Sequence, residues 1–297
     1  MLGAMLGCHS RCLCVPESQF IEQALVTHDN GVHLDPRKYL ARIVANERYR
    51  LFWKLPIDPS TVDDRELGST FAQVLTWLVA AYGRKLGRDG AEVWVDHTPT
   101  NFRRRRALLR LFPDAQFIHL VRDGRAVAAS LLPLDWGPND TLHAAEFWLA
   151  RCALGLAAEL DAGPQQVLRV RYEDVLMHPE SSLRRIAAFA GLEYEPAMAG
   201  GGGQRPSPYH QRQHQLVGEP PDPSRAERWQ QVFTPRQVEI FEAEAGELLE
   251  ILGYQLEYGI GAHPATRAEV LGLRLRDLAR RARNNLQRRW RARRSMA

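Results

Sequence analysis

Short apolar runs alternate along this chain with stretches in which apolar residues recur every three or four positions. The runs are typical of buried strands, and the recurring stretches are typical of helices packed on one face. Strands are predicted at 92–95, 116–121 and 166–172. Helices are predicted at 65–87, 99–111, 124–132, 141–161 and 179–190 and within 225–254. This order favours an α/β fold with a largely parallel sheet.

Capping residues sharpen two of these helix predictions. Thr98 suits the N-cap and Pro99 the first position of the helix 99–111. Pro179 stands near the start of its helix, and Gly191 follows its end. The glycine-rich stretch 199–208 predicts a flexible connector and contains no phosphate-loop pattern.

Charge is distributed unevenly along the chain, whose net charge is +4. Residues 267–294 contain eleven arginines against Glu269 and Asp277, a net of +9, which leaves −5 for residues 1–266. We therefore expect one large domain, 1–262, followed by a basic tail, 263–297.

Apolar residues form one stripe within this basic tail. They recur at helical spacing, at Leu271, Leu275, Leu278, Ala282, Leu286 and Trp290. A basic amphipathic helix of this kind lies on an anionic membrane surface, packs on the body of the protein or stays solvated, and the sequence leaves these alternatives open. Specific nucleic-acid binding is not expected, because Trp290 is the only aromatic residue among the arginines.

The cysteines offer little chemistry of their own. Cys8, Cys12 and Cys14, with His9, match no common zinc framework, so we expect reduced thiols and no bound metal. No apolar run reaches the roughly 18 residues of a membrane span. The first ten residues lack the basic start of a signal peptide. We expect a cytoplasmic protein, peripheral to the membrane if the tail binds lipid.

The stretch "QFIHLVRDGRAVAASLL" (116–132) joins a strand to a helix through a polar turn. Ligands of parallel α/β sheets bind beyond the carboxyl ends of the strands, where helix N-termini attract anions. Arg122 would add a bidentate fork for a phosphate, Ser130 a hydroxyl, and Gly124 a tight backbone turn. The alternative is that Arg122 only pairs with Asp123 or another neighbour.

The longer stretch "LFPDAQFIHLVRDGRAVAASLL" resembles the 3′-phosphate-binding segment of sulfotransferases that use 3′-phosphoadenosine 5′-phosphosulfate (PAPS), most closely bacterial enzymes related to tyrosylprotein and carbohydrate sulfotransferases. The resemblance continues in "VPESQF" (15–20), "DHTP" (96–99), "RYEDVLMHPESSLRRIAAFAGL" (171–192) and "RW…LLEILGY". It implies a P-loop-NTPase-like fold of three layers around a parallel central sheet. It also implies sulfuryl transfer from PAPS, without a metal, to a hydroxyl of a sugar, a lipid, a small metabolite or tyrosine.

The resemblance also implies roles for individual residues. Arg122 and Ser130 would hold the 3′-phosphate, and Tyr172 would lie against the adenosine end, although a core aromatic is an alternative for Tyr172. The segment from His210 to Arg225 would close over the donor, with Arg225 as a further ligand. Glu17 would be the catalytic base, which suits a carboxylate beside an acceptor hydroxyl. Its alternative role is to favour a helix start as an acidic residue.

Two positions depart from the family pattern. His97 stands where a lysine is usual, and it would donate one hydrogen bond or serve as the base in place of Glu17. The family's R/K-S-G-T-T/S loop and the strand before it, which hold the 5′-phosphosulfate, are missing ahead of Met1. Our hypothesis is that the natural start lies upstream, which reading the preceding codons would test. An inactive nucleotide-binding relative and a P-loop kinase-like protein are the alternatives, and the absence of G-x-x-x-x-G-K-[ST] argues against the kinase.

Overall fold

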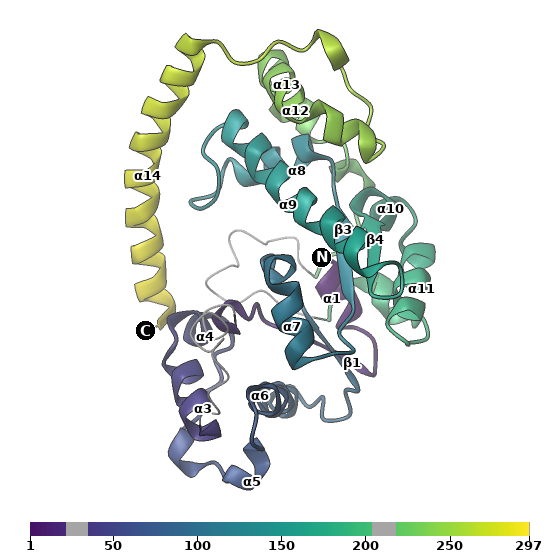
Figure 1. The fold of residues 1–297 in the computed structure, drawn as a ribbon, viewed down its shortest axis with the longest axis vertical. Coiled ribbons are helices and arrows are strands. Elements are labelled where there is room, and N and C mark those ends of the chain that lie inside the picture. Colours follow the sequence, from purple (N-terminus) through teal and green to yellow (C-terminus); the bar gives the residue numbers. More distant parts are fainter. Residues whose placement is uncertain (22–34, 204–217, 297) are drawn as a thin grey trace. The chain divides into compact units, whose positions relative to one another are not determined.

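The computed structural model describes residues 1–21, 35–203 and 218–296, and the side chains of Leu286 and Arg288–Met296 are excluded from the description. The chain divides into two compact units. The first comprises Met1–Phe117, Pro179–Pro221 and the last three residues, and the second comprises Ile118–His178 and Asp222–Arg294. Most of the α-helices and strands of both are labelled in Figure 1.

The first unit packs helices around one pair of strands. Its strands are β1 (Cys12–Val15) and β2 (Val93–Asp96). Its α-helices are α1 (Leu2–Leu6), α3 (Pro36–Ala45), α4 (Glu47–Phe52), α5 (Asp64–Leu67), α6 (Phe71–Lys85), α7 (Arg105–Leu111) and α11 (Pro179–Phe189). Its 3₁₀-helices are η1 (Pro59–Thr61), η2 (Asn101–Arg104) and η3 (Pro196–Gly200). The two strands are parallel, with Cys12 opposite Val93 and Val15 opposite Asp96, and all four residues of β1 are buried.

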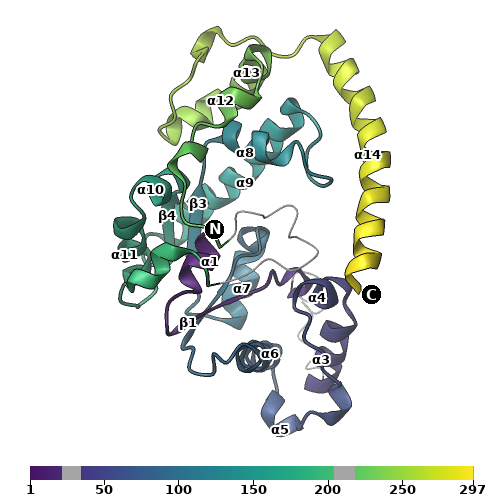
Figure 2. The same ribbon diagram turned by 180° about the vertical axis from the view of Figure 1, so that it is seen from behind.

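The second unit contains the other strand pair, β3 (Phe117–Val121) and β4 (Val167–Arg171). Its α-helices are α8 (Gly124–Leu131), α9 (Thr141–Ala162), α10 (Tyr172–Met177), α12 (Trp229–Val232), α13 (Pro235–Ile251) and α14 (Arg267–Met296). Its 3₁₀-helices are η4 (Pro223–Arg225) and η5 (Gly259–Gly261). The helices α8, α9 and α13 lie beside one another in both views (Figures 1 and 2) and bury Trp148 and Phe241 in a shared core.

The predicted strands and most of the predicted helices are present, so the α/β class is confirmed. Within the described ranges the strands pair as two two-stranded sheets. The helix predicted over 65–87 is divided into α5 and α6 at Gly68, whose φ of 70° lies in the left-handed region. Thr70 then starts α6 with a reciprocal pair of hydrogen bonds to Gln73, which satisfies the amides that open the helix.

The helix predicted over 99–111 is also divided, into η2 and α7, and Thr98 does not cap it. The Thr98 hydroxyl instead accepts a hydrogen bond from the Ser18 amide at 2.7 Å and donates one to Asp96 Oδ1 at 2.6 Å. The N-cap prediction was wrong because a tertiary partner takes the hydroxyl. In the part of the chain that is described, no helix is both long enough and apolar enough to cross a bilayer.

Candidate functional site

The turn between β3 and α8 is built by the capping of α8 and by close packing. Asp123 is the N-cap, and its carboxylate accepts a hydrogen bond from the Arg125 amide at 2.8 Å. A Cβ atom on Gly124 would lie 2.7 Å from ring atoms of both Phe241 and Trp148. The φ of Gly124 is not in the left-handed region. The glycine is therefore required by the approach of two aromatic rings, and not by a tight turn as expected from the sequence.

The guanidinium of Arg122 has contacts on several sides. Its Nη1 donates to Ser130 Oγ at 3.3 Å, and its Nη2 donates to the carbonyl oxygen of Arg225 at 3.2 Å. Its central carbon lies 4.4 Å from the centroid of the Tyr172 ring, a cation–π distance. The predicted convergence of Arg122 and Ser130 is thus confirmed. All four residues predicted to bind the donor meet within the second unit, and we call Arg122, Ser130, Tyr172 and Arg225 the arginine clamp.

The alternative in which Arg122 pairs with Asp123 is not what the structure shows. The Asp123 carboxylate pairs with Arg125, at 2.8 Å. Among the described residues Arg122 forms no ion pair, and its Nε is buried without a hydrogen-bond partner. A buried N–H of this kind costs free energy unless a ligand or water accepts from it. The clamp therefore offers unpaired positive charge to an anion.

The remaining clamp contacts fix its geometry. Trp148 Nε1 donates to the carbonyl of Arg122 at 3.1 Å, which holds the backbone of the turn. Ser130 Oγ donates to the Ala126 carbonyl at 2.8 Å, so its lone pairs face Arg122. Arg225 contributes its carbonyl, while its side chain pairs with Asp222 at 3.3 Å. Of the segment predicted to close over the donor, residues 210–217 lie outside the described residues.

Beneath the clamp lies a buried ion-pair network that the sequence analysis missed. Arg125 Nη1 donates to Glu242 Oε1 at 2.6 Å, and its guanidinium stacks on Trp229 at 4.1 Å. Its two carboxylate partners, Asp123 and Glu242, raise the pKa of Arg125 although burial acts to lower it. Arg125 could have been noticed in the sequence, because it is the second arginine of "RDGR". Nothing local indicated Glu242, which is 117 positions away.

A second link joins the clamp turn to α10. The Asp123 amide donates to Glu173 Oε1 at 3.0 Å, and the Tyr254 hydroxyl donates to Glu173 Oε2, also at 3.0 Å. Glu173 is the neighbour of Tyr172 in sequence. The Glu173 carboxylate therefore ties the turn that follows Arg122 to the helix that begins with Tyr172.

The two predicted catalytic residues, Glu17 and His97, lie in the first unit. The parallel register ends with Val15 opposite Asp96, so Glu17 and His97 follow at the same edge of the β1–β2 pair. The bond from the Ser18 amide to Thr98 Oγ1 ties the two loops together there. The structure thus brings the two residues to one edge of this strand pair.

Burial raises the pKa of Glu17, and the nearby Asp96 carboxylate raises it further. A hydrogen bond of 2.6 Å from Gln19 Nε2 to Glu17 Oε2 opposes this shift by favouring the charged form. A raised pKa makes a carboxylate a better proton acceptor near neutral pH. Helical residues begin at Gln19, so the carboxylate also stands just ahead of a helix start.

His97 is the more accessible of the pair. Its Nδ1 lies 3.7 Å from Sγ of the buried Cys14. Desolvation by the surrounding protein lowers the pKa of His97, against the attraction of Asp96. The residue nevertheless keeps an exposed surface. The imidazole is therefore neutral at pH 7 and can donate or accept a single hydrogen bond at each nitrogen.

Comparison with known proteins now gives these residues a context. Residues 1–196 match the model of the sulfotransferase family. The chain belongs to this family. The matched range contains Glu17, His97, Arg122, Ser130 and Tyr172.

Curated relatives resemble parts of this sulfotransferase. Protein-tyrosine sulfotransferase 2 of Gallus gallus is 24% identical over 199 residues, 65% of this chain and 48% of the relative. Omega-hydroxy-beta-dihydromenaquinone-9 sulfotransferase Stf3 of Mycobacterium tuberculosis is 32% identical over 106 residues, 32% of this chain and 27% of the relative. Nodulation protein NoeE of Sinorhizobium fredii is 32% identical over 139 residues, 40% of this chain and 32% of the relative. The chain thus spans about half or less of the length of these relatives.

Solved structures share the fold. The sulfotransferase domain of the Synechococcus PCC 7002 olefin synthase has a TM-score of 0.53 and 21% identity, and covers 86% of this chain and 90% of its own. The sulfotransferase domain of the curacin biosynthetic pathway has a TM-score of 0.54 and 17% identity, and the match covers 86% of this chain and 93% of that domain. At these identities the likeness establishes the sulfotransferase-domain fold alone.

Proposed function

We propose that this chain transfers a sulfuryl group from PAPS to a hydroxyl group of an acceptor. The observation that carries the proposal is the arginine clamp: Arg122 has a buried N–H without a partner, and no carboxylate among the residues that the structure describes neutralises it. A phosphate monoester matches this geometry, because it offers several acceptor oxygens and a double negative charge. Family membership supports the assignment of that phosphate to a sulfate donor.

In this proposal the 3′-phosphate of the donor accepts hydrogen bonds from Arg122 and Ser130. The ring of Tyr172 lies against the adenosine end. The Arg225 carbonyl orients the Arg122 guanidinium by accepting a hydrogen bond from it, and the Arg225 side chain adds a positive charge. Ser130 must turn its hydroxyl from Ala126 to the ligand, which needs only a rotation about one bond. The buried network around Arg125 keeps the turn rigid, so little ordering is required on binding.

The proposed reaction is an in-line displacement at sulfur. The acceptor oxygen forms a bond to sulfur while the bond from sulfur to the phosphate oxygen breaks, and adenosine 3′,5′-bisphosphate leaves. Glu17 takes the proton of the acceptor hydroxyl, and its raised pKa suits that role. His97, neutral at pH 7, donates one hydrogen bond to charge that develops during transfer.

The acceptor is proposed only as a class. Relatives are named for protein tyrosine and for a hydroxylated menaquinone, both of which carry a hydroxyl group. The common chemistry is therefore a hydroxyl nucleophile.

Binding of adenosine 3′,5′-bisphosphate and of adenosine 5′-monophosphate by the full chain, measured by calorimetry, tests the clamp without an acceptor. We expect the wild-type protein to prefer the bisphosphate. The Arg122→Ala variant should lose about ten- to a hundredfold in affinity for the bisphosphate only, because charge-assisted hydrogen bonds to the 3′-phosphate are removed. Arg184→Ala, which removes an exposed arginine paired with Glu180, is the matched control and should bind as wild type.

Equal affinity of wild type and Arg122→Ala for the bisphosphate would overturn the proposal. A preference for ATP over the bisphosphate would point to the kinase class instead.

A further inference from the structure

The helix α14 is attached to the second unit through polar residues. Asn139 Nδ2 donates to Asp277 Oδ1 at 2.6 Å, and Asn284 Nδ2 donates to Asn139 Oδ1 at 3.1 Å. Arg280 Nη1 donates to the Asn139 carbonyl at 2.9 Å, and its Nη2 donates to the Leu132 carbonyl. Asp277 and Asn284 are buried. Positions 277, 280 and 284 share one helix face, and this face meets the body.

The leucines of the helix lie on the opposite face. Leu271, Leu275 and Leu278 are spaced by four and three residues, so they form a second stripe. Their exposed fractions are 61%, 62% and 64%. A helix on a globular protein normally buries its apolar stripe and exposes its polar residues. In α14 the arrangement is reversed: the helix meets the body through polar residues, while Leu271, Leu275 and Leu278 stay largely exposed.

The exposed surface of α14 is positively charged as well as apolar. The helix contains only two acidic residues. Glu269 pairs with Arg236 at 2.8 Å and Asp277 pairs with Arg281 at 2.7 Å. Exposed arginines remain elsewhere around the helix, at positions 267, 274, 276 and 283.

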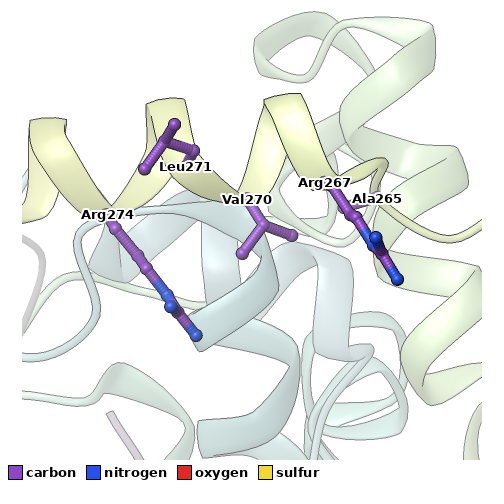
Figure 3. Close-up of a pocket in the computed structure, with 5 residues that line it drawn as sticks. All are labelled: Ala265, Arg267, Val270, Leu271 and Arg274. Carbon is purple, nitrogen blue, oxygen red and sulfur yellow. The ribbon is translucent and has the colours of Figure 1, made fainter.

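A small pocket of about 340 Å³ lies at the start of α14. It is lined by Ala265, Arg267, Val270, Leu271 and Arg274. In Figure 3, Arg267, Val270 and Arg274 extend to one side of the helix and Leu271 extends to the other. Two guanidinium groups beside aliphatic carbon suit a group that is anionic at one end and apolar at the other.

We propose that α14 lies on an anionic phospholipid surface, with Leu271, Leu275 and Leu278 inserted at the headgroup level and the flanking arginines on lipid phosphates. Apolar insertion and attraction to anionic headgroups act together in surface-bound helices. A second copy of this chain fits the face poorly, because each copy brings the same positive charge. A nucleic acid would use the arginines but would leave the leucines uncovered.

Sedimentation of the full chain with vesicles tests this proposal. We expect binding to vesicles of phosphatidylcholine with phosphatidylserine and little binding to phosphatidylcholine alone. The triple variant L271Q/L275Q/L278Q should bind at least about tenfold more weakly, because apolar insertion is lost. A variant with R274Q, R276Q and R283Q should lose the preference for phosphatidylserine and the sensitivity to salt.

The matched control removes three exposed apolar side chains elsewhere in the same unit, as L160Q/M177Q/I251Q. It should bind vesicles as wild type. Unchanged affinity of every variant for adenosine 3′,5′-bisphosphate, or unchanged circular dichroism should that ligand not bind, shows that the fold is intact. This readout separates failure of the membrane proposal from failure of the proposed function.

Three results would overturn the proposal. Equal binding of wild type to neutral and anionic vesicles would remove the role of charge. A nucleic acid would be indicated if the leucine variant bound vesicles as tightly as wild type, only the arginine variant lost binding, and RNA displaced the protein from the vesicles. A wild-type dimer in sedimentation velocity that the leucine variant abolishes would indicate a second copy.

Discussion

At the scale of single residues, two glycines show how closely side chains approach in the second unit. A Cβ atom on Gly155 would lie 2.1 Å from Nε2 of His119, a buried residue of β3. Gly124 stands under the clamp in the same way, against Trp148 and Phe241. Backbone flexibility explains neither position, because neither glycine has a φ in the left-handed region. In both cases the missing side chain makes room for a ring.

We therefore expect Gly124→Ala to destabilise the protein by about 1–3 kcal/mol, because an added methyl group in a packed core forces its neighbours to shift. The free energy of unfolding in urea, followed by tryptophan fluorescence, measures the effect. Gly272→Ala is the control in the same unit, since the nearest atom to its added Cβ is Arg276 Nη2 at 3.7 Å. The control should be slightly stabilising, as alanine is the better helix former. Equal effects of the two substitutions would contradict this account of Gly124.

Glu17 allows a prediction of how stability depends on pH. Its pKa is raised in the folded protein, so the folded protein binds a proton at Glu17 more tightly than the unfolded protein does. Wild-type stability should then fall as pH rises from the ordinary glutamate pKa through the raised value, and stay level above it. Glu17→Gln removes this loss. The variant should match wild type near pH 4 and be more stable near pH 7 in urea unfolding.

Glu92 provides a control of opposite sign in the same unit. Hydrogen bonding from Arg11 lowers the pKa of Glu92, so its contribution to stability is present above the ordinary pKa and lost as pH falls. Glu92→Gln should therefore weaken the protein near neutral pH, although only slightly because the pair is exposed. If the Glu17→Gln variant is less stable than wild type at pH 7, burial of the charged Glu17 carboxylate does not destabilise the wild-type protein.

At the scale of elements, one asparagine makes several of the contacts that attach α14 to the rest of the second unit. Asn139 contacts Asp277, Arg280 and Asn284 through its side chain and its carbonyl. Two of these partners are buried, so loss of the amide leaves a buried carboxylate and a buried amide with fewer partners. The attachment is polar and depends on this residue more than on apolar packing.

Asn139→Ala should accordingly loosen α14. We expect trypsin to cut within 267–294 several times faster than in wild type, since local opening exposes the arginines to the protease. The cleavage sites and rates can be followed by mass spectrometry. Gln287→Ala, an exposed change on the same helix, should leave the rate unchanged. Identical cleavage of Asn139→Ala and wild type would mean that other contacts hold the helix.

Local patterns predicted β2, β3, β4 and most of the helices after residue 64, but not β1, α3 or α4. Tertiary contacts explain where two of the predictions failed. Arg122 and Ser130 could be placed together because both belong to one strand–turn–helix segment. The network through Glu242 could not, since no spacing rule joins residues 117 positions apart. Thr98 was misassigned because its partner, Ser18, lies 80 positions away. The leucine period predicted an amphipathic α14 but not which face meets the body, which the contacts of Asn139 decide.

At the scale of the whole molecule, the chain passes more than once between its two units, because each unit combines separate segments. The predicted division at 262/263 follows charge and not compactness, and it stays a prediction. The first unit carries Glu17 and His97, while the second carries the arginine clamp and α14. Positive charge is concentrated in the second unit, because the basic residues 267–294 belong to it.

The polar attachment of α14 has an evolutionary consequence. Since the outward leucines are largely exposed, selection for folding constrains them only weakly. Under the membrane proposal, descendants of this gene could exchange those three positions, and with them the surface that the protein binds, while the core and the clamp stay unaltered. Cellular address and chemistry would then evolve independently within a single polypeptide.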